Sequence, residues 1–411
     1  METIIFGIII ALIILYYVFS FFADYLNDQM RTKPIPENVE DVYDTEQYAK
    51  WLSYSRETSR IGFIESALAF LFILLMLLNG GFLMLATWTR DMTSSVYTEM
   101  FAFLGIIFAI NFVYRLPFNA YRTFSIETRY GFNRTTVNTF IKDRIISVIL
   151  TVLLGGGLVY FITWLLENTG NYFILFAFIG IMVVFLFINI TYTKLLLPLF
   201  NTLTPLEDGE LKTRIEDFAA SQNYEIKKIH VMDASKRSSK LNAFFSGFGR
   251  FKNVVLFDTL INVMDNDQIM AVLAHEIGHA KHKDVVKNII FSMVQFALIL
   301  SLFFAFVRID VFAQAFGWEN VVHYGFMLLI FAIALSPVLM PLNILRNSIS
   351  RRYEYAADKF AATNIGKTPM KEALKVLARE NFAQLTVHPL YVFLYYSHPP
   401  ITFRVAAIDH A

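Results

Sequence analysis

The chain has 411 residues, of which 56% are hydrophobic and only 17% are charged. A soluble globular domain is about 25% charged, so this composition excludes an ordinary soluble protein and indicates a membrane protein. The formal net charge of +1 gives no reason to expect a nucleic-acid partner. Because the chain has no cysteine, disulfides and thiolate ligands are excluded, and any metal must be held by His, Asp or Glu.

Seven apolar runs each come near the roughly 20 residues that a helix needs to cross the hydrocarbon of a bilayer. The first run lacks the basic leader and small-residue cleavage site of a secretory signal, so we expect it to be a retained span. The predicted spans cover residues 3–22, 61–84, 98–114, 145–166, 172–193, 288–307 and 322–345. This pattern predicts a mainly α-helical, multi-pass integral membrane protein.

The basic residues predict which way the spans face. All but two of the 35 Lys and Arg residues lie in segments 23–60, 115–144, 194–287 and 346–411. Cytoplasmic segments collect positive charge, so we expect these four segments in the cytoplasm and the amino terminus outside. The predicted organisation has four parts: a membrane region, 1–193, with loops 23–60 and 115–144; a polar segment, 194–287; the last two spans, 288–345; and a helical carboxyl-terminal segment, 346–411.

The polar segment has mixed helix and strand periodicity. Helical spacing covers residues 206–222, and short strands are expected at 226–232, 240–247 and 252–257. A hairpin turn between the last two strands would use Gly247, Gly249 and Arg250. The polar segment therefore predicts a small α+β unit.

The helix that follows these strands carries a histidine cluster. Asp265 with Gln268 three residues later forms a capping box, which predicts a helix that begins here and runs straight into the sixth span. Its HEIGH sequence places His275 and His279 on one helix face, where both can bind one metal ion. Glu276 is placed to take a proton from a water that the metal activates, as in zinc peptidases.

A hydrolytic zinc site needs a third protein ligand and an open fourth position. His282 lies seven residues, about 10.5 Å along a straight helix, from His275, so we expect it to be an interfacial residue. The segment RRYEYAADKF is a better source, because the sixth and seventh spans form a hairpin that returns it to the same side. We expect Glu354 to bind the metal and Asp358 to hydrogen-bond a ligand histidine.

Two further segments carry candidate residues for substrate. LNAFFSG, 241–247, predicts an edge strand beside the catalytic helix, which would bind a peptide through main-chain hydrogen bonds while Asn242 contacts the peptide backbone. SHPP places His398 before two prolines that fix its loop, which suits a donor to the oxyanion of a tetrahedral intermediate.

The motifs HEIGH, EYAAD, SKRSSKLNAFFSG, VLFDTLI and SHPP together resemble the type I CAAX prenyl protease family of integral-membrane zinc endopeptidases. The resemblance also covers residues 36–57, 116–133 and 198–211, so it spans nearly the whole chain. It implies seven transmembrane helices around a water-filled chamber, with a small α+β zinc protease domain closing the cytoplasmic end.

The resemblance also implies a role for each candidate residue. Zinc, one ion per chain, would be held by His275, His279 and Glu354, with Glu276 as the general base. Asp358 would support a ligand histidine. The substrate would contact Asn242, Ala243 and Phe244, and His398 and Arg404 would lie near the scissile peptide.

Two features separate the chain from eukaryotic members of that family. It ends in IDHA without a dilysine retrieval tail, and its loops are compact, so we expect a prokaryotic plasma membrane rather than the endoplasmic reticulum. The expected partners are the lipid bilayer and a peptide or protein substrate, prenylated if the family activity is kept. Two alternatives remain: a quality-control protease for misfolded membrane proteins, and a seven-helix transporter or scaffold with a vestigial metal site.

Overall fold

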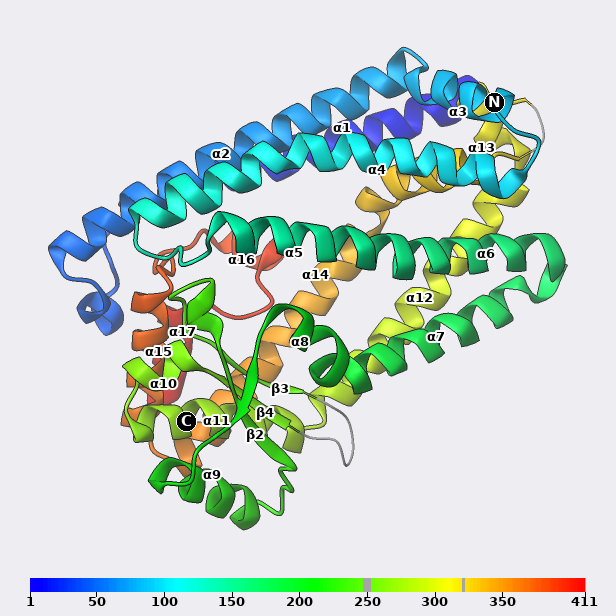
Figure 1. The fold of residues 1–411 in the computed structure, drawn as a ribbon. Coiled ribbons are helices and arrows are strands. Elements are labelled where there is room, and N and C mark those ends of the chain that lie inside the picture. Colours follow the sequence, from blue (N-terminus) through cyan, green and yellow to red (C-terminus); the bar gives the residue numbers. More distant parts are fainter. Residues whose placement is uncertain (247–252, 320–321, 411) are drawn as a thin grey trace.

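The computed structural model describes residues 1–246, 253–319 and 322–410 of the chain (Figure 1). Within these ranges seven helical segments are long and apolar enough to cross a membrane, which confirms the predicted number of spans. They are Glu2–Thr32, Thr45–Leu78, Val96–Glu127, Val137–Asn168, Gly170–Phe200, Asp284–Arg308 and Tyr324–Asn364. The predicted turn at Gly247, Gly249 and Arg250 lies outside the described residues.

The helices of the membrane part are α1 (Glu2–Gln29), α2 (Thr45–Leu78), α3 (Gly81–Asp91), α4 (Val96–Tyr121), α5 (Val137–Leu150), α6 (Gly157–Asn168), α7 (Phe173–Thr191), α8 (Leu197–Phe200), α12 (Asp284–Arg308), α13 (Asp310–Ala315) and α14 (Tyr324–Asn364). Short 3-10 or π-helical stretches connect or extend them at Met30–Thr32, Glu37–Val42, Arg122–Glu127, Thr151–Gly156, Gly170–Tyr172 and Tyr192–Leu196.

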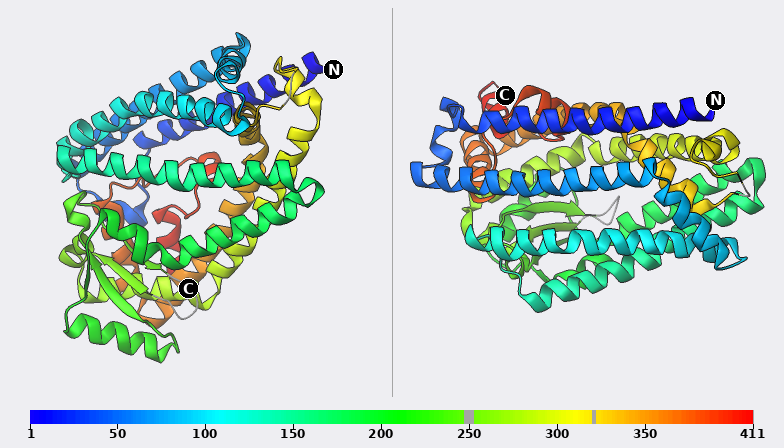
Figure 2. Two further views of the ribbon diagram at one scale, coloured as in Figure 1. Left: turned by 45° about the vertical axis from the view of Figure 1, so that its right-hand side comes forward. Right: turned by 90° about the horizontal axis from the view of Figure 1, so that it is seen from above.

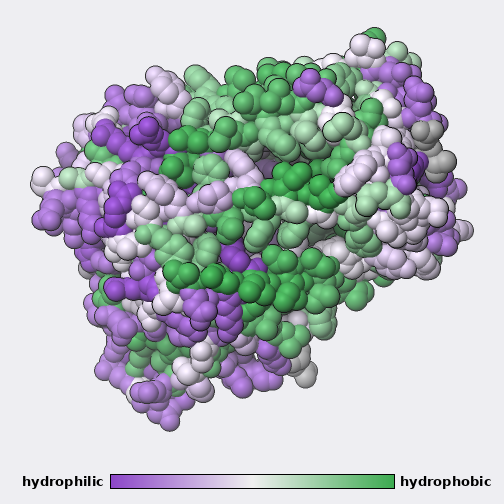
Figure 3. All heavy atoms as spheres, turned by 45° about the horizontal axis from the view of Figure 1, so that its top comes forward, coloured by the Kyte–Doolittle hydropathy of each residue, from purple (hydrophilic) through white to green (hydrophobic). Residues whose placement is uncertain are grey.

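The last two spans bring distant parts of the chain together. Helix α14 contacts both α1 and α4, and α12 contacts α7 (Figures 1 and 2). The largest core cluster lies among these spans and includes the fully buried rings of Phe103, Phe173 and Phe326. The space-filling view shows a hydrophobic band over the spans between hydrophilic ends (Figure 3). The two termini lie at opposite ends of the molecule, as an odd number of spans requires (Figure 1).

The second span ends earlier in the chain than the apolar run 61–84 predicted. Helix α2 ends at Leu78, and α3 begins at Gly81. Gly80 between them has φ of 66°, a left-handed conformation that glycine adopts without strain and that commonly ends a helix. The prediction was wrong because the apolar residues continue across the break, so hydropathy alone does not reveal where the helix ends.

The polar segment forms a four-stranded sheet at one end of the spans, in the order β1-β2-β4-β3. The strands are β1 (Leu203–Pro205), β2 (Lys228–Met232), β3 (Ala243–Ser246) and β4 (Asn253–Phe257). Strands β2 and β4 are parallel, and the other two pairs are antiparallel. Three of these strands were predicted, with β3 at an edge, whereas the three-residue β1 is too short to show alternation. The expected mainly α-helical fold with seven spans and a small α+β unit is thus confirmed.

Six helices accompany the sheet: α9 (Glu210–Ser221), α10 (Asp258–Val263), α11 (Asn266–Lys281), α15 (Lys367–Glu380), α16 (Pro389–Tyr395) and α17 (Ile401–Asp409). The predicted capping box of α11 is confirmed. The Asp265 carboxylate accepts from Gln268 N at 2.8 Å, and the Gln268 side chain accepts from Asp265 N at 3.3 Å. Buried Leu256 and Ile269 belong to the core that joins α11 to the sheet.

Helix α11 does not run straight into the sixth span, contrary to the prediction. It ends at Lys281, and α12 begins at Asp284. Lys283 between them has φ of 60°, a left-handed conformation that costs a non-glycine residue roughly 1–2 kcal/mol. Residues 280–286 include no glycine or proline to indicate this break.

Candidate metal centre

The candidate site lies where α11 packs against the final turns of α14. Helix α14 continues without interruption from the seventh span to Asn364, so it carries Glu354 out of the apolar region to the face of α11. His275 and His279 are one turn apart on α11 and present both rings to that carboxylate. One long helix thus unites two segments of the chain that are far apart in sequence.

The donor triad, which we define as His275, His279 and Glu354, has the spacing of a metal site. The two Nε2 atoms are 3.1 Å apart. Glu354 Oε2 lies 3.4 Å from His275 Nε2, and Glu354 Oε1 lies 3.3 Å from His279 Nε2. Ligands of a tetrahedral zinc with bonds of 2.0–2.1 Å are about 3.4 Å apart. Glu354 Oε2 is also buried and has no hydrogen-bond partner among the described residues, so this donor set fits a metal ion.

Each histidine of the triad is held through its other ring nitrogen. His275 Nδ1 lies 2.8 Å from Asp358 Oδ1, and His279 Nδ1 lies 3.1 Å from Asp284 Oδ2. Both carboxylates are buried, and a carboxylate at Nδ1 keeps the proton there and leaves the Nε2 lone pair free for a metal. The sequence predicted the contact of Asp358 but missed Asp284, which the break between α11 and α12 places beside His279.

Arg404 on α17 lies behind the triad. Its Nε and Nη2 atoms donate to the two oxygens of Asp358 at 2.8 and 2.6 Å, and Nη2 lies 3.5 Å from Glu354 Oε2. The guanidinium is buried, so its charge offsets part of the negative charge that the carboxylates gather here.

His398 lies near the other oxygen of Glu354. Its Nε2 lies 3.2 Å from Glu354 Oε1, and its Nδ1 lies 2.9 Å from the Ser397 hydroxyl. The side chain is 63% exposed, so it is open to a molecule bound beside the triad. His282 lies apart from this group, with its ring centroid 6.3 Å from that of Phe360.

The electrostatics of α11 favour a cation at the triad. Burial opposes protonation of His275, but the adjacent carboxylates of Asp358 and Glu354 outweigh it and raise its pKa to about 9. The same attraction acts on a metal ion in place of the proton. Burial raises the pKa of Glu276 above its usual range, against the opposing effect of the two histidines, which brings a carboxyl group closer to the range useful for proton transfer at neutral pH.

A cavity of about 590 Å³ lies beside the triad, between α1, α12, α14 and α16. His398 is in its wall, together with the amides of Asn343 and Asn347 and the guanidinium of Arg346. Polar groups on a spanning helix are costly in lipid but can face such a space. The cavity therefore extends from the polar face of α14 to His398, which contacts Glu354 of the triad.

The predicted substrate residues lie on the sheet instead. Asn242 is exposed and directly precedes β3, Ala243 is buried in the sheet core, and Phe244 is half-buried. Strand β3 contacts α11. Within the described ranges, none of these three residues has a hydrogen bond or ion pair with the triad or with the residues that surround it.

Comparisons with known proteins agree with this architecture over its whole length. A family model described as the CAAX prenyl protease N-terminal region, with five membrane helices, matches residues 24–202, and the model of peptidase family M48 matches residues 205–411. The CAAX prenyl protease 1 homolog of Oryza sativa is 32% identical over 98% of this chain and 97% of its own length. CAAX prenyl protease 1 of Saccharomyces cerevisiae is 33% identical over 92% of this chain and 88% of its own.

A solved structure gives the same result for the fold. The crystal structure of S. mikatae Ste24p matches with a TM-score of 0.92 at 32% sequence identity, covering 98% of this chain and 99% of the other. The family expected from the sequence motifs is thereby confirmed. The chain belongs to the CAAX prenyl protease family of membrane metallopeptidases.

Proposed function

We propose that this chain is a zinc-dependent endopeptidase whose single zinc ion is held by His275, His279 and Glu354. The observation that carries this proposal is the spacing of the three donor groups: the two Nε2 atoms are 3.1 Å apart, and each lies 3.3 to 3.4 Å from one oxygen of Glu354. An ion held this way has a fourth position open, which is what distinguishes a catalytic zinc site from a structural one. When bound, zinc supplies a Lewis acid that polarises a carbonyl and makes a water nucleophilic at neutral pH.

The surrounding side chains move the proton and stabilise charge. Glu276 accepts the proton of the attacking water and passes it to the leaving amine, a task that its raised pKa supports. His398, exposed beside Glu354, donates to the oxyanion that forms at the scissile carbonyl. Asp358 and Asp284 hold the two histidine rings, and Arg404 is a positioning residue that fixes the carboxylate of Asp358.

We further propose that the substrate lies along β3. Among the described strands β3 pairs only with β4, so its other edge is available to an extended peptide. The main chain at Ala243 and Phe244 would pair with the peptide while the exposed Asn242 amide contacts its backbone. The cavity lined by His398 would take the part of the substrate on the membrane side of the scissile bond.

The proposed substrate is a prenylated CAAX protein, because the relatives are named CAAX prenyl proteases. The basic segments support a triad on the cytoplasmic side, because nearly all Lys and Arg residues lie at that end. The expected membrane is a prokaryotic plasma membrane, which fractionation of the source cells tests.

The decisive experiment uses the full-length protein purified in detergent. A farnesylated CAAX peptide, the same peptide without the farnesyl group and an unfolded soluble protein are incubated with it, with and without a chelator, while zinc is counted by elemental analysis. Chelator-sensitive cleavage of the farnesylated peptide alone supports the proposal. Cleavage of the unfolded protein in preference would favour the quality-control protease, and no cleavage with no bound zinc would favour the vestigial site.

A further inference from the structure

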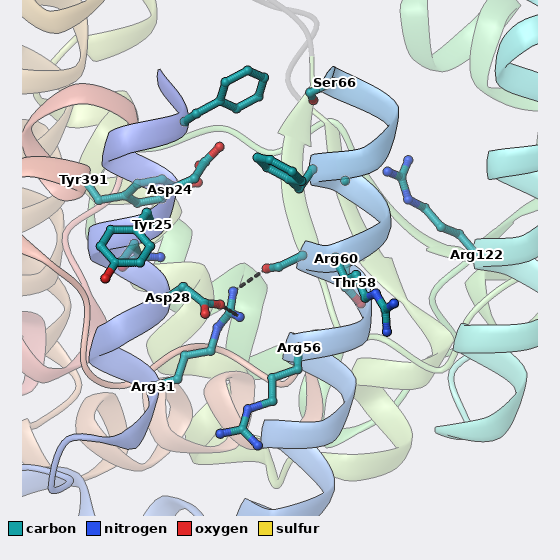
Figure 4. A pocket seen from close by; sticks show the side chains of 15 residues that line it. Asp24, Tyr25, Asp28, Arg31, Arg56, Thr58, Arg60, Ser66, Arg122 and Tyr391 are labelled. Atoms are coloured by element: carbon teal, nitrogen blue, oxygen red, sulfur yellow. Dashed lines mark hydrogen bonds and ion pairs between the residues drawn. The ribbon is translucent and has the colours of Figure 1, made fainter. Parts of the chain in front are cut away.

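A second cavity, of about 670 Å³, lies between α1 and α2, far along both helices from their apolar centres (Figure 4). In the sequence, the apolar part of α1 gives way to Asp24 and Asp28, and α2 becomes apolar only after Arg60. The cavity therefore sits where the first two spans leave the hydrocarbon, at the depth of lipid headgroups.

The lining of this cavity carries more positive than negative charge. Its charged side chains are four arginines and two acids: Arg31, Arg56, Arg60, Arg122, Asp24 and Asp28. Arg31 pairs with Asp28, and Arg122 pairs with Glu65 at 2.6 Å. In the part of the chain that the structure describes, Arg56 and Arg60 have neither an ion pair nor a hydrogen bond. These two arginines lie one turn apart on α2, with the Arg56 guanidinium directed toward α1 and that of Arg60 toward the other side of the helix (Figure 4).

Arg31 gives an independent indication of a missing partner. It lies in the 3-10 turn that follows α1 and bonds to Asp28 on α1 and to Ser59 on α2, so it joins the two helices (Figure 4). Its side chain is only 7% exposed, yet its Nε atom is buried without a hydrogen-bond partner among the described residues. Buried donors are nearly always paired, and an anion between α1 and α2 would pair this one.

The apolar part of the lining faces the membrane side of the arginines. Phe21, Tyr25 and Phe63 line the cavity, and Tyr25 and Phe63 are 60% and 53% exposed. Aromatic side chains at this depth contact the glycerol and the first carbons of a lipid while charged groups bind its headgroup. Arginines beside exposed aromatic side chains are the groups expected of a site that binds a lipid phosphate and the adjoining apolar part of the lipid.

We propose that the space between α1 and α2 binds the phosphate of an anionic membrane lipid. Arg31 and Arg56 donate to its oxygens, Arg60 adds positive potential, and the aromatic side chains contact its glycerol and acyl chains. A free phosphate ester would offer the same oxygens without the apolar part. The inference does not depend on the peptidase activity proposed above, because it involves no residue of the donor triad.

The test is isothermal titration calorimetry of the full-length protein in detergent, titrated separately with dihexanoyl phosphatidic acid, dihexanoyl phosphatidylcholine and sodium phosphate. We expect one saturable site per chain for phosphatidic acid and at least about tenfold weaker binding of the other two. Each arginine near an anionic headgroup contributes about a factor of five in affinity, so Arg56→Gln with Arg60→Gln should weaken phosphatidic acid binding about 25-fold.

The matched control is Arg134→Gln with Lys142→Gln, which removes the same charge from exposed residues at the same end of the spans. It should change the affinity by less than about twofold. Arg31→Lys keeps the charge but loses the Nε donor, and it should weaken phosphatidic acid binding while thermal unfolding shows the protein still folded. Equal affinity for the two lipids would refute the proposed site. Equal losses of phosphatidic acid affinity in the two double variants would also refute it. If sodium phosphate binds as tightly as phosphatidic acid, the proposal that the ligand is a lipid is wrong, and the ligand is a soluble phosphate.

Discussion

Gly278 on α11 lies so close to Ala357 on α14 that a Cβ added at residue 278 would be 3.1 Å from the Ala357 Cα. The same Cβ would be 3.3 Å from the Cβ of Phe360. Both neighbours sit on a rigid helix, so neither can move without moving α14. The absence of a side chain at position 278 is therefore what lets the two helices bring the histidines within reach of Glu354.

The first prediction is that Gly278→Ala lowers zinc content and stability. Overpacking of this kind costs about 1–3 kcal/mol, and the shift of α11 separates His275 and His279 from Glu354. Thermal unfolding and elemental analysis measure the two effects. Gly105→Ala in α4 is the control, because a Cβ there meets nothing within 4 Å and a helical alanine is favoured over glycine. Equal behaviour of the two variants would show that the close approach is unimportant.

The second prediction concerns the third ligand. Glu354→Ala should reduce bound zinc from about one ion per chain to well under half, because two histidines alone do not complete a zinc site. Elemental analysis after dialysis gives the count. Glu372→Ala, at a partly exposed carboxylate on α15, should keep the full amount. Undiminished zinc in Glu354→Ala would remove this residue from the ligand set.

The third prediction separates proton transfer from metal binding. Glu276→Gln preserves the size of the side chain but cannot accept a proton, so we expect unchanged zinc and a fall in kcat of about 10²–10⁴-fold. Glu225→Gln, at an exposed acid outside the site, should leave kcat unchanged. Substantial turnover by purified Glu276→Gln would refute its assignment as the base.

The fourth prediction tests Asp284, which hydrogen-bonds His279 and also lies 3.0 Å from Lys287. Asp284→Asn should lower zinc affinity about 10–100-fold, because the ring of His279 loses the charge that orients it. Competition with a zinc-binding dye measures the affinity. Asp310→Asn, an exposed acid at the start of α13, should have no effect. An unchanged affinity in Asp284→Asn would make its contact with His279 incidental.

The fifth prediction is that His398→Ala lowers kcat about 10²–10³-fold while zinc content stays the same. The reason is that His398 contacts Glu354 from the cavity and would stabilise charge only during the reaction. His410→Ala, at an exposed histidine near the end of the chain, serves as the control. Loss of zinc in His398→Ala would instead make this residue part of the metal site.

The sequence by itself determined the features that depend on neighbouring residues. Apolar runs of about 20 residues predicted the seven spans, because hydrocarbon thickness fixes the length of a crossing helix. The capping box at Asp265 and the pairing of His275 with His279 on one helix face follow from helical geometry within a few residues. The motif residues also sufficed to predict the family to which the chain belongs.

The tertiary structure decided what depends on packing between distant segments. The left-handed conformation of Lys283 between α11 and α12 could not be predicted from the neighbouring residues. Nor could the position of Asp284 beside His279. The same is true of the bridge from Arg31 to Ser59, which joins two helices across the cavity proposed to bind lipid. The periodicity of apolar residues shows which face of a helix or strand is apolar. Which other element packs against that face depends on contacts between residues far apart in the chain.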